Sequence, residues 1–145
     1  MQHKKSTTIT RLLTIITIIA MMLTANTAFA GEAEGQALFQ SKCQKCHLVD
    51  RQMTGPALKG VRSRWAYTTV LYSWIKNSAS VLASGDKYAN DLFKQYNGAA
   101  MNAFPELTDA DIFDILTYIY AEDKRITERN AAGAGGGGAI AAEEK

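Results

Sequence analysis

The chain has 145 residues, of which 47% are hydrophobic and 21% charged, and this length and composition predict one folded domain. Without residues 1–30, which have the features of an export signal, 13 basic and 14 acidic side chains remain, for a net charge of −1. This balance excludes a general nucleic-acid-binding protein, which would need a strong basic excess.

Residues 1–30 have the pattern of a secretory signal. A basic start precedes an apolar run at 12–23, and residues 28–30 supply small side chains for cleavage before Gly31. The run is about a dozen residues long, whereas a membrane span needs roughly 20. We therefore expect a cleaved signal peptide at 1–30 and a mature protein in the periplasm of a Gram-negative bacterium. An uncleaved leader, which would tether the protein to a membrane, is the alternative.

The mature chain has helical periodicity in four segments and no strand-like alternation of useful length. The expected helices cover 32–43, 69–77, 86–96, where Asn97-Gly98 stops the helix, and a last segment that begins at Thr108. Residues 47–66 contain Gly55-Pro56 and Gly60 and are expected to form a loop. The predicted fold class is all-α.

The last helix has the most specific signals. Thr108 can cap its start, and Asp111, three residues later, completes a capping box; Leu107 and Ile112 are spaced for a hydrophobic staple. Its apolar face consists of Ile112, Ile115, Leu116 and Ile119.

Residues 130–145 are mostly alanine and glycine, which cannot bury a core, so they are expected to form a flexible tail after a domain at 31–129. A tether to another subunit and an end without a role both fit this composition.

The charges of the mature chain are unevenly distributed. Residues 42–94 hold nine basic and three acidic side chains, whereas residues 95–145 hold four basic and nine acidic ones. Such asymmetry can give a dipole that steers docking on an acidic partner. An ordinary solvated surface accounts for it equally well.

The pentapeptide Cys43-Gln44-Lys45-Cys46-His47 has the spacing of a c-type haem attachment site. Two thiols three residues apart on a helical turn can each add to one vinyl group of the haem, and the next residue then directs an imidazole toward the iron. The motif predicts one haem c held covalently by Cys43 and Cys46, with His47 as an iron ligand. A large apolar cofactor would also supply interior that a domain this short lacks.

Other uses of the two cysteines fit less well. A disulfide or a thioredoxin-like redox pair is compatible with export, but no βαβ pattern surrounds the motif and the next residue is histidine. A structural zinc site needs four ligands, and the mature chain has no further cysteine or histidine.

The second axial ligand must then be a residue other than histidine, and the mature methionines are Met53 and Met101. Met53 lies six residues after His47, so it would have to pass around the haem edge almost at once. Met101 lies 54 residues after His47, beyond helices that can enclose the ring, and directly before the capped last helix. We expect Met101 to be the ligand. Met53 and an open site are the alternatives.

With these motifs, the chain resembles the class I monohaem cytochromes c of bacterial and mitochondrial type over nearly all of residues 33–122. Three blocks in the right order support the resemblance besides the attachment motif: 35–39, 55–60 and 101–112. The resemblance implies a small all-α cytochrome c fold wrapped around one covalently attached haem.

The resemblance also implies roles for individual residues. Gly35 would let the last helix approach closely, and Phe39 would pack on it against Ile115 and Tyr118. The carbonyl of Pro56 would accept a hydrogen bond from the ligand histidine and so orient the imidazole.

One residue departs from the family pattern. Asn102 stands where many bacterial relatives have proline, which implies a less rigid ligand loop. Arg64, Trp65 and Trp74 would contact the haem propionates or pack on the ring, while ordinary core or surface roles remain open for all three.

A haem held by His47 and Met101 has no vacant position for a substrate, so the expected chemistry is one-electron exchange rather than enzymatic catalysis. A soft thioether and burial both raise the reduction potential. We therefore expect a high-potential carrier between a quinol-oxidising complex and a terminal oxidase or similar acceptor. The alternatives are a tethered electron-transfer subunit of a larger respiratory complex and a haem enzyme or gas binder with an open sixth site.

Overall fold

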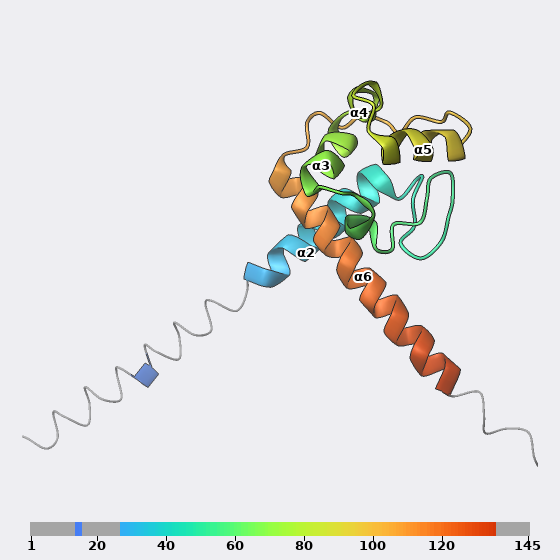
Figure 1. Cartoon of the computed structure of the whole chain (residues 1–145). Helices are drawn as coiled ribbons and strands as arrows, with labels where there is room; N and C mark the ends of the chain where they lie inside the picture. The colour runs from blue at the N-terminus through green and yellow to red at the C-terminus, as the bar shows by residue number, and fades with distance from the viewer. Residues whose placement is uncertain (1–13, 16–26, 136–145) are drawn as a thin grey trace, which may run out of the picture. The chain divides into compact units, whose positions relative to one another are not determined.

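The computed structural model describes residues 14–15 and 27–135, and all regular secondary structure in these ranges is helical (Figure 1). Within residues 27–135 the helical elements are α2 (Thr27–Leu38), a π-helix (Phe39–Cys43), a 3-10 helix (Val61–Arg64), α3 (Thr68–Lys76), α4 (Ser78–Ala83), α5 (Lys87–Gln95) and α6 (Asp109–Gly135). The predicted all-α class is confirmed. None of the helices in the described ranges is both long and apolar enough to cross a membrane.

Much of the predicted leader lies outside the described residues. Helix α2 begins at Thr27, so the cleavage point predicted before Gly31 falls inside its first turns. The described residues from Glu32 to Gly135 belong to one compact unit.

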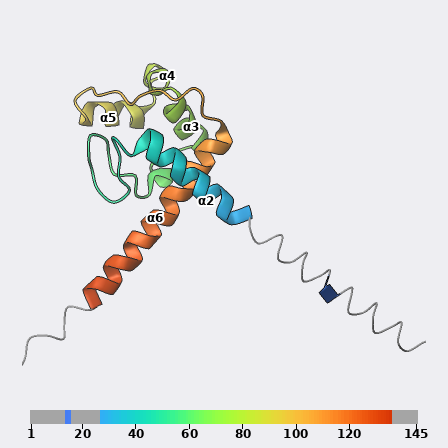
Figure 2. The same ribbon diagram turned by 180° about the vertical axis from the view of Figure 1, so that it is seen from behind.

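Helices α2 and α6 cross at close range, as both views of the chain show (Figures 1 and 2). A β-carbon at Gly35 would lie 2.0 Å from the carbonyl oxygen of Asp114 and 2.9 Å from the backbone nitrogen of Ile115. Only glycine permits this backbone approach. One turn later the buried ring of Phe39 packs on Tyr118, with centroids 5.3 Å apart. The crossing therefore has the form implied by the family resemblance.

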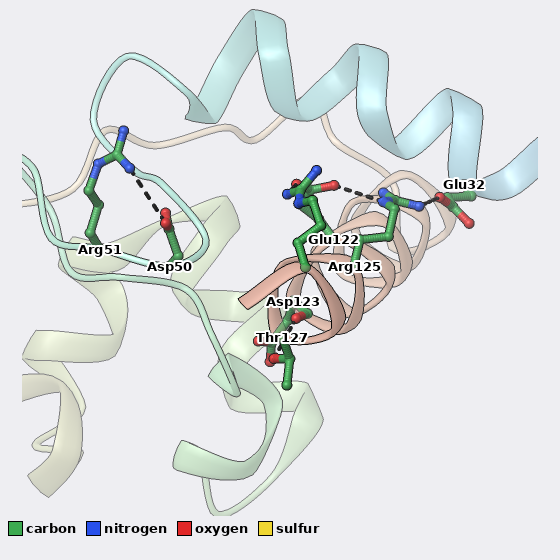
Figure 3. Close-up of polar contacts among 8 residues, drawn as sticks. Glu32, Asp50, Arg51, Glu122, Asp123, Arg125 and Thr127 are labelled. Carbon is green, nitrogen blue, oxygen red and sulfur yellow. Dashed lines mark hydrogen bonds and ion pairs between the residues drawn. The ribbon is translucent and has the colours of Figure 1, made fainter. Parts of the chain in front are cut away.

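Charged side chains reinforce this crossing (Figure 3). The guanidinium of Arg125 on α6 pairs with Glu32 on α2 and with Glu122 one turn earlier on its own helix. Lys59, in the loop after the motif, pairs with Asp123 at 3.3 Å. These contacts connect the middle of α2 and the loop after the motif to the middle of α6.

Helix α6 has the predicted capping box. The backbone N–H of Thr108 donates to the Asp111 carboxylate at 2.8 Å, and the N–H of Asp111 donates to the Thr108 hydroxyl at 3.1 Å. Leu107 and Ile112, the expected staple residues, are 3% and 0% exposed. The helix continues to Gly135, so residues 130–135 of the predicted flexible tail are helical, and the rest of that tail lies outside the described residues.

The middle of the chain contains one more α-helix than the sequence predicted, and a 3-10 helix (Val61–Arg64) lies inside the predicted loop at 47–66. Helix α4 follows α3 after the single residue Asn77, whose side-chain oxygen accepts a hydrogen bond from the backbone of Ser80 at 3.2 Å. Six residues are too few for a clear amphipathic repeat, which is why periodicity did not reveal α4. Helix α4 packs against α3 and α5, and α3 packs against α6.

Candidate functional site

The three chemical groups of the pentapeptide are positioned by the end of the first helix. The last turns widen into the π-helix, where the backbone N–H of Gln44 donates to the carbonyl of Phe39. The N–H groups of Cys46 and His47 then both donate to the carbonyl of Cys43, at 3.1 and 3.0 Å. This tight turn brings both thiols and the imidazole to the same part of the molecule.

These side chains border a largely apolar hollow in the core. It consists of two adjoining cavities of about 270 and 70 Å³, which share six lining residues: Cys43, His47, Pro56, Trp74, Leu92 and Met101. Cys46 lines the larger cavity, so all five residues predicted for the site surround one space. Aliphatic side chains from α3 and α6 line the smaller cavity.

The loop after the motif holds the imidazole of His47 firmly. Nδ1 lies 2.9 Å from the carbonyl oxygen of Pro56. Because a carbonyl can only accept, Nδ1 carries the proton and donates, which leaves Nε2 in the form that binds a metal. Next to it, a β-carbon at Gly55 would lie 2.3 Å from Cε1 of the ring. The contact predicted for Pro56 is therefore present.

The two candidate methionines have different surroundings. Met101 is partly buried and lines both cavities. Met53 is 43% exposed and is not among the residues that line either cavity. Of the two, only Met101 shares the hollow with His47.

The surroundings of Cys43 do not favour the alternative uses of a cysteine pair. Burial raises the pKa of the Cys43 thiol to about 11, whereas redox-active and metal-binding thiols have a lowered pKa. Both cysteines are free. In the part of the chain that the structure describes, no three His, Cys, Asp or Glu side chains are grouped to hold a metal ion.

An orphaned polar group next to the hollow fits a haem in particular. The Nε atom of Arg64 is buried without a hydrogen-bond partner, although Nη2 of the same side chain donates to the carbonyl of Ala57 at 2.8 Å. Arg64 lines the smaller cavity together with Trp65 and Trp74. A buried guanidinium N–H needs an acceptor, and a haem propionate carboxylate is a strong one.

Sequence reasoning assigned no site role to several other lining residues. Phe93 of α5, Tyr96 directly after α5, and Phe104 before α6 line the larger cavity. The apolar face of α5 was predictable from its spacing, but periodicity cannot distinguish a face that packs on protein from one that lines a cofactor cavity.

The cytochrome c family model matches residues 32–121, the segment that contains this hollow. A cytochrome c2 from Rhodopseudomonas palustris (strain ATCC BAA-98 / CGA009) is 42% identical over 67 residues, which are 44% of this chain and 48% of that protein. A second cytochrome c2 from Rhodopseudomonas palustris is 50% identical over 42 residues, or 29% of this chain and 36% of that one. The chain thus spans less than half the length of these curated relatives.

Two solved structures have a similar fold. A cytochrome c domain from Pseudomonas putida superposes with a TM-score of 0.55 at 30% identity, covering 67% of this chain and 94% of that one. A cytochrome c from Rhodothermus marinus gives a TM-score of 0.54 at 24% identity, covering 69% of this chain and 79% of that one.

Proposed function

The chain belongs to the cytochrome c family of electron carriers with one covalently bound haem c, and we propose that it works in the periplasm between a quinol-oxidising complex and a terminal oxidase. The observation that carries the proposal is the shared hollow. Two thiols, an imidazole and a thioether surround one apolar space of the described chain. When bound there, the haem supplies one-electron exchange between Fe(II) and Fe(III).

Each of these residues has a distinct part in the proposal. Cys43 and Cys46 would form the thioether links, and His47 and Met101 would be the two axial ligands. The carbonyl of Pro56 fixes the tautomer of His47 through the 2.9 Å contact with Nδ1. If His47 and Met101 both ligate the iron, no ligand position would remain for a substrate, which favours a carrier over an enzyme.

The surroundings of the hollow would set a high reduction potential. A thioether ligand favours the reduced metal, and apolar walls disfavour the extra positive charge of the oxidised one. The guanidinium of Arg64 would bind a propionate and neutralise a negative charge that would otherwise stabilise Fe(III).

The charge asymmetry between the two halves of the sequence gives the proposal little support. Basic side chains of the first half pair with acidic ones of the second, at 2.7 Å for Lys42–Glu106, 3.3 Å for Lys59–Asp123 and 2.5 Å for Lys76–Asp109. These pairs place three of the nine basic side chains of residues 42–94 next to acidic side chains of residues 95–145, which reduces the separation of charge between the two halves. The choice of redox partner is therefore proposed on the chemistry of the site alone.

The test uses the protein expressed with its leader in a bacterium that attaches haem to exported proteins. We expect a periplasmic product without residues 1–30, a sulfur-to-iron charge-transfer band in the ferric state, and no binding of carbon monoxide in the ferrous state. We also expect reduction by a quinol-oxidising complex and oxidation by a terminal oxidase. Rapid binding of carbon monoxide would favour a gas binder or haem enzyme, and a membrane-bound product with an intact leader would favour a tethered subunit.

A further inference from the structure

Ser78 has an unusual environment for a serine. It is the first residue of α4 and is 2% exposed, and among the described residues no other Ser, Thr, Asn, Gln or charged side chain is fully buried. Its hydroxyl donates to the backbone carbonyl of Met101 at 2.7 Å, across 23 residues of sequence. A serine at a helix start usually serves its own helix. Here Asn77 caps α4. The hydroxyl of Ser78 instead donates to the ligand loop, the segment 97–108 that contains Met101.

The same junction holds the ligand loop at a second point. Residues 97–108 contain no helix, and the loop leaves α5 through two residues with positive φ, Asn97 at 55° and Gly98 at 76°. The backbone N–H of Phe104 donates to the carbonyl of Lys76 at 3.1 Å. Residues at the junction between α3 and α4 therefore form hydrogen bonds with the loop at Met101 and again at Phe104.

The identity of the residue after Met101 makes these hydrogen bonds important for the position of the Met101 thioether. A proline at position 102 would restrict the backbone of Met101 to extended conformations, but Asn102 imposes no such restriction. The carbonyl that Ser78 binds belongs to the peptide that joins Met101 to Asn102. The partly buried hydrogen bond to this carbonyl fixes the orientation of that peptide plane, and the plane in turn constrains where the Met101 side chain begins.

We propose that Ser78 is a positioning residue that keeps the thioether of Met101 at the hollow by holding the carbonyl of Met101. The inference rests on the proposed function, in which Met101 is the second axial ligand. Ser78 itself does not line the hollow, so it acts only through the loop.

The test compares variants of the full holoprotein by titrating the ferric state with imidazole, which competes with the thioether. One hydrogen bond of this kind contributes about 0.5–1.5 kcal/mol, so Ser78→Ala should raise the apparent imidazole affinity about two- to tenfold. The sulfur-to-iron band should weaken in parallel. This loss of band intensity should increase as the temperature rises.

Two matched controls separate positioning from folding. Ser80→Ala makes the same substitution two residues later, where the exposed hydroxyl donates to the carbonyl of Asn77 at 2.9 Å, and should leave both readouts unchanged. The second control compares Ser78→Thr with Ser78→Val. The threonine and valine side chains have nearly the same shape, but only threonine keeps the hydroxyl. We expect Ser78→Thr to keep the imidazole affinity of the wild-type protein and Ser78→Val to have the raised affinity of Ser78→Ala. This pair carries the same test if the alanine variant yields too little holoprotein.

The outcomes distinguish the two proposals. A ferric wild-type protein without the sulfur-to-iron band would overturn the ligand assignment of Met101 and the role of Ser78 with it. A wild-type protein with the band, together with Ser78→Ala or Ser78→Val variants of unchanged imidazole affinity, would overturn the positioning role alone. Equal effects of Ser78→Ala and Ser80→Ala would also overturn it.

Discussion

The imidazole of His47 lies directly against the backbone of Gly55: a β-carbon at position 55 would come within 2.3 Å of Cε1 and 2.7 Å of Nδ1. The adjacent carbonyl of Pro56 accepts the hydrogen bond from Nδ1. Steric contact near Cε1 and a hydrogen bond at Nδ1 thus leave the ring little freedom to turn. Residues 55 and 56 together act as the support of the proposed iron ligand.

Gly55→Ala should therefore disturb the site, because either the ring or the loop must move to admit a methyl group. Overpacking of this kind costs about 1–3 kcal/mol. We expect a lower melting temperature for the holoprotein, a lower yield of attached haem and an altered haem absorption spectrum. Gly133→Ala in α6 is a suitable control, since a β-carbon there meets no atom within 4 Å. A Gly55→Ala protein with the native spectrum and melting temperature would contradict the tight support of His47.

Replacement of Met101 should change the properties of the haem, whereas replacement of Met53 should not. Met101→Ala is expected to abolish the sulfur-to-iron band, to open the iron to carbon monoxide, and to lower the reduction potential because a soft ligand is lost. Met53→Ala should change none of these, because Met53 is 43% exposed and lines neither cavity. Absorption spectra of the ferric proteins decide the question, and survival of the band in Met101→Ala would reassign the ligand.

Local signals in the sequence predicted much of the fold. The capping box of Thr108 and Asp111 could be recognised because both partners of the hydrogen bonds lie within one helical turn. Helix α4 was missed because it is only six residues long and depends on its packing against α3 and α5. The extension of α6 to Gly135 was missed because alanine and glycine were interpreted as a flexible tail, although alanine strongly favours helix.

Three of the five predicted site residues lie together for a similar reason. Cys43, Cys46 and His47 lie in one pentapeptide, so their proximity follows from a single turn of chain. The contact between Ser78 and Met101 joins residues 23 positions apart and depends on how α3 and α4 meet. Composition and periodicity carry no information on such a contact, and a serine in the sequence has no feature that marks it as buried.

Arg64 provides a test of the propionate assignment. Arg64→Gln removes a positive charge next to the hollow, where Nε is buried without a partner. Loss of that charge should stabilise Fe(III) relative to Fe(II), so a redox titration is expected to give a lower reduction potential than that of the wild-type protein. Arg62→Gln makes the same change on the exposed surface, where the guanidinium lies 5.4 Å from the ring centroid of Phe113, and should alter the potential less.

Acid should loosen the far end of the ligand loop through Glu106. A hydrogen bond from the ammonium of Lys42 holds the pKa of the Glu106 carboxyl below its ordinary value of 4.5. Because the pKa is lower in the folded protein than in the unfolded chain, the contact stabilises the fold fully above the ordinary value. This contribution is lost as the pH falls through the lowered pKa of the folded state.

Glu106→Gln should therefore remove part of the decline in melting temperature between neutral pH and the acid range, and lower the melting temperature slightly at neutral pH. The effect should be small, because the side chain of Glu106 is 55% exposed, and it should shrink further in high salt. Glu34→Gln is the matched control, since Glu34 forms no ion pair within the described residues. If Glu106→Gln and the wild type lose stability in parallel on acidification, the ion pair between Lys42 and Glu106 does not stabilise the loop in solution. The hydrogen bonds of the loop with Ser78 and Lys76 would then hold it in place without this ion pair.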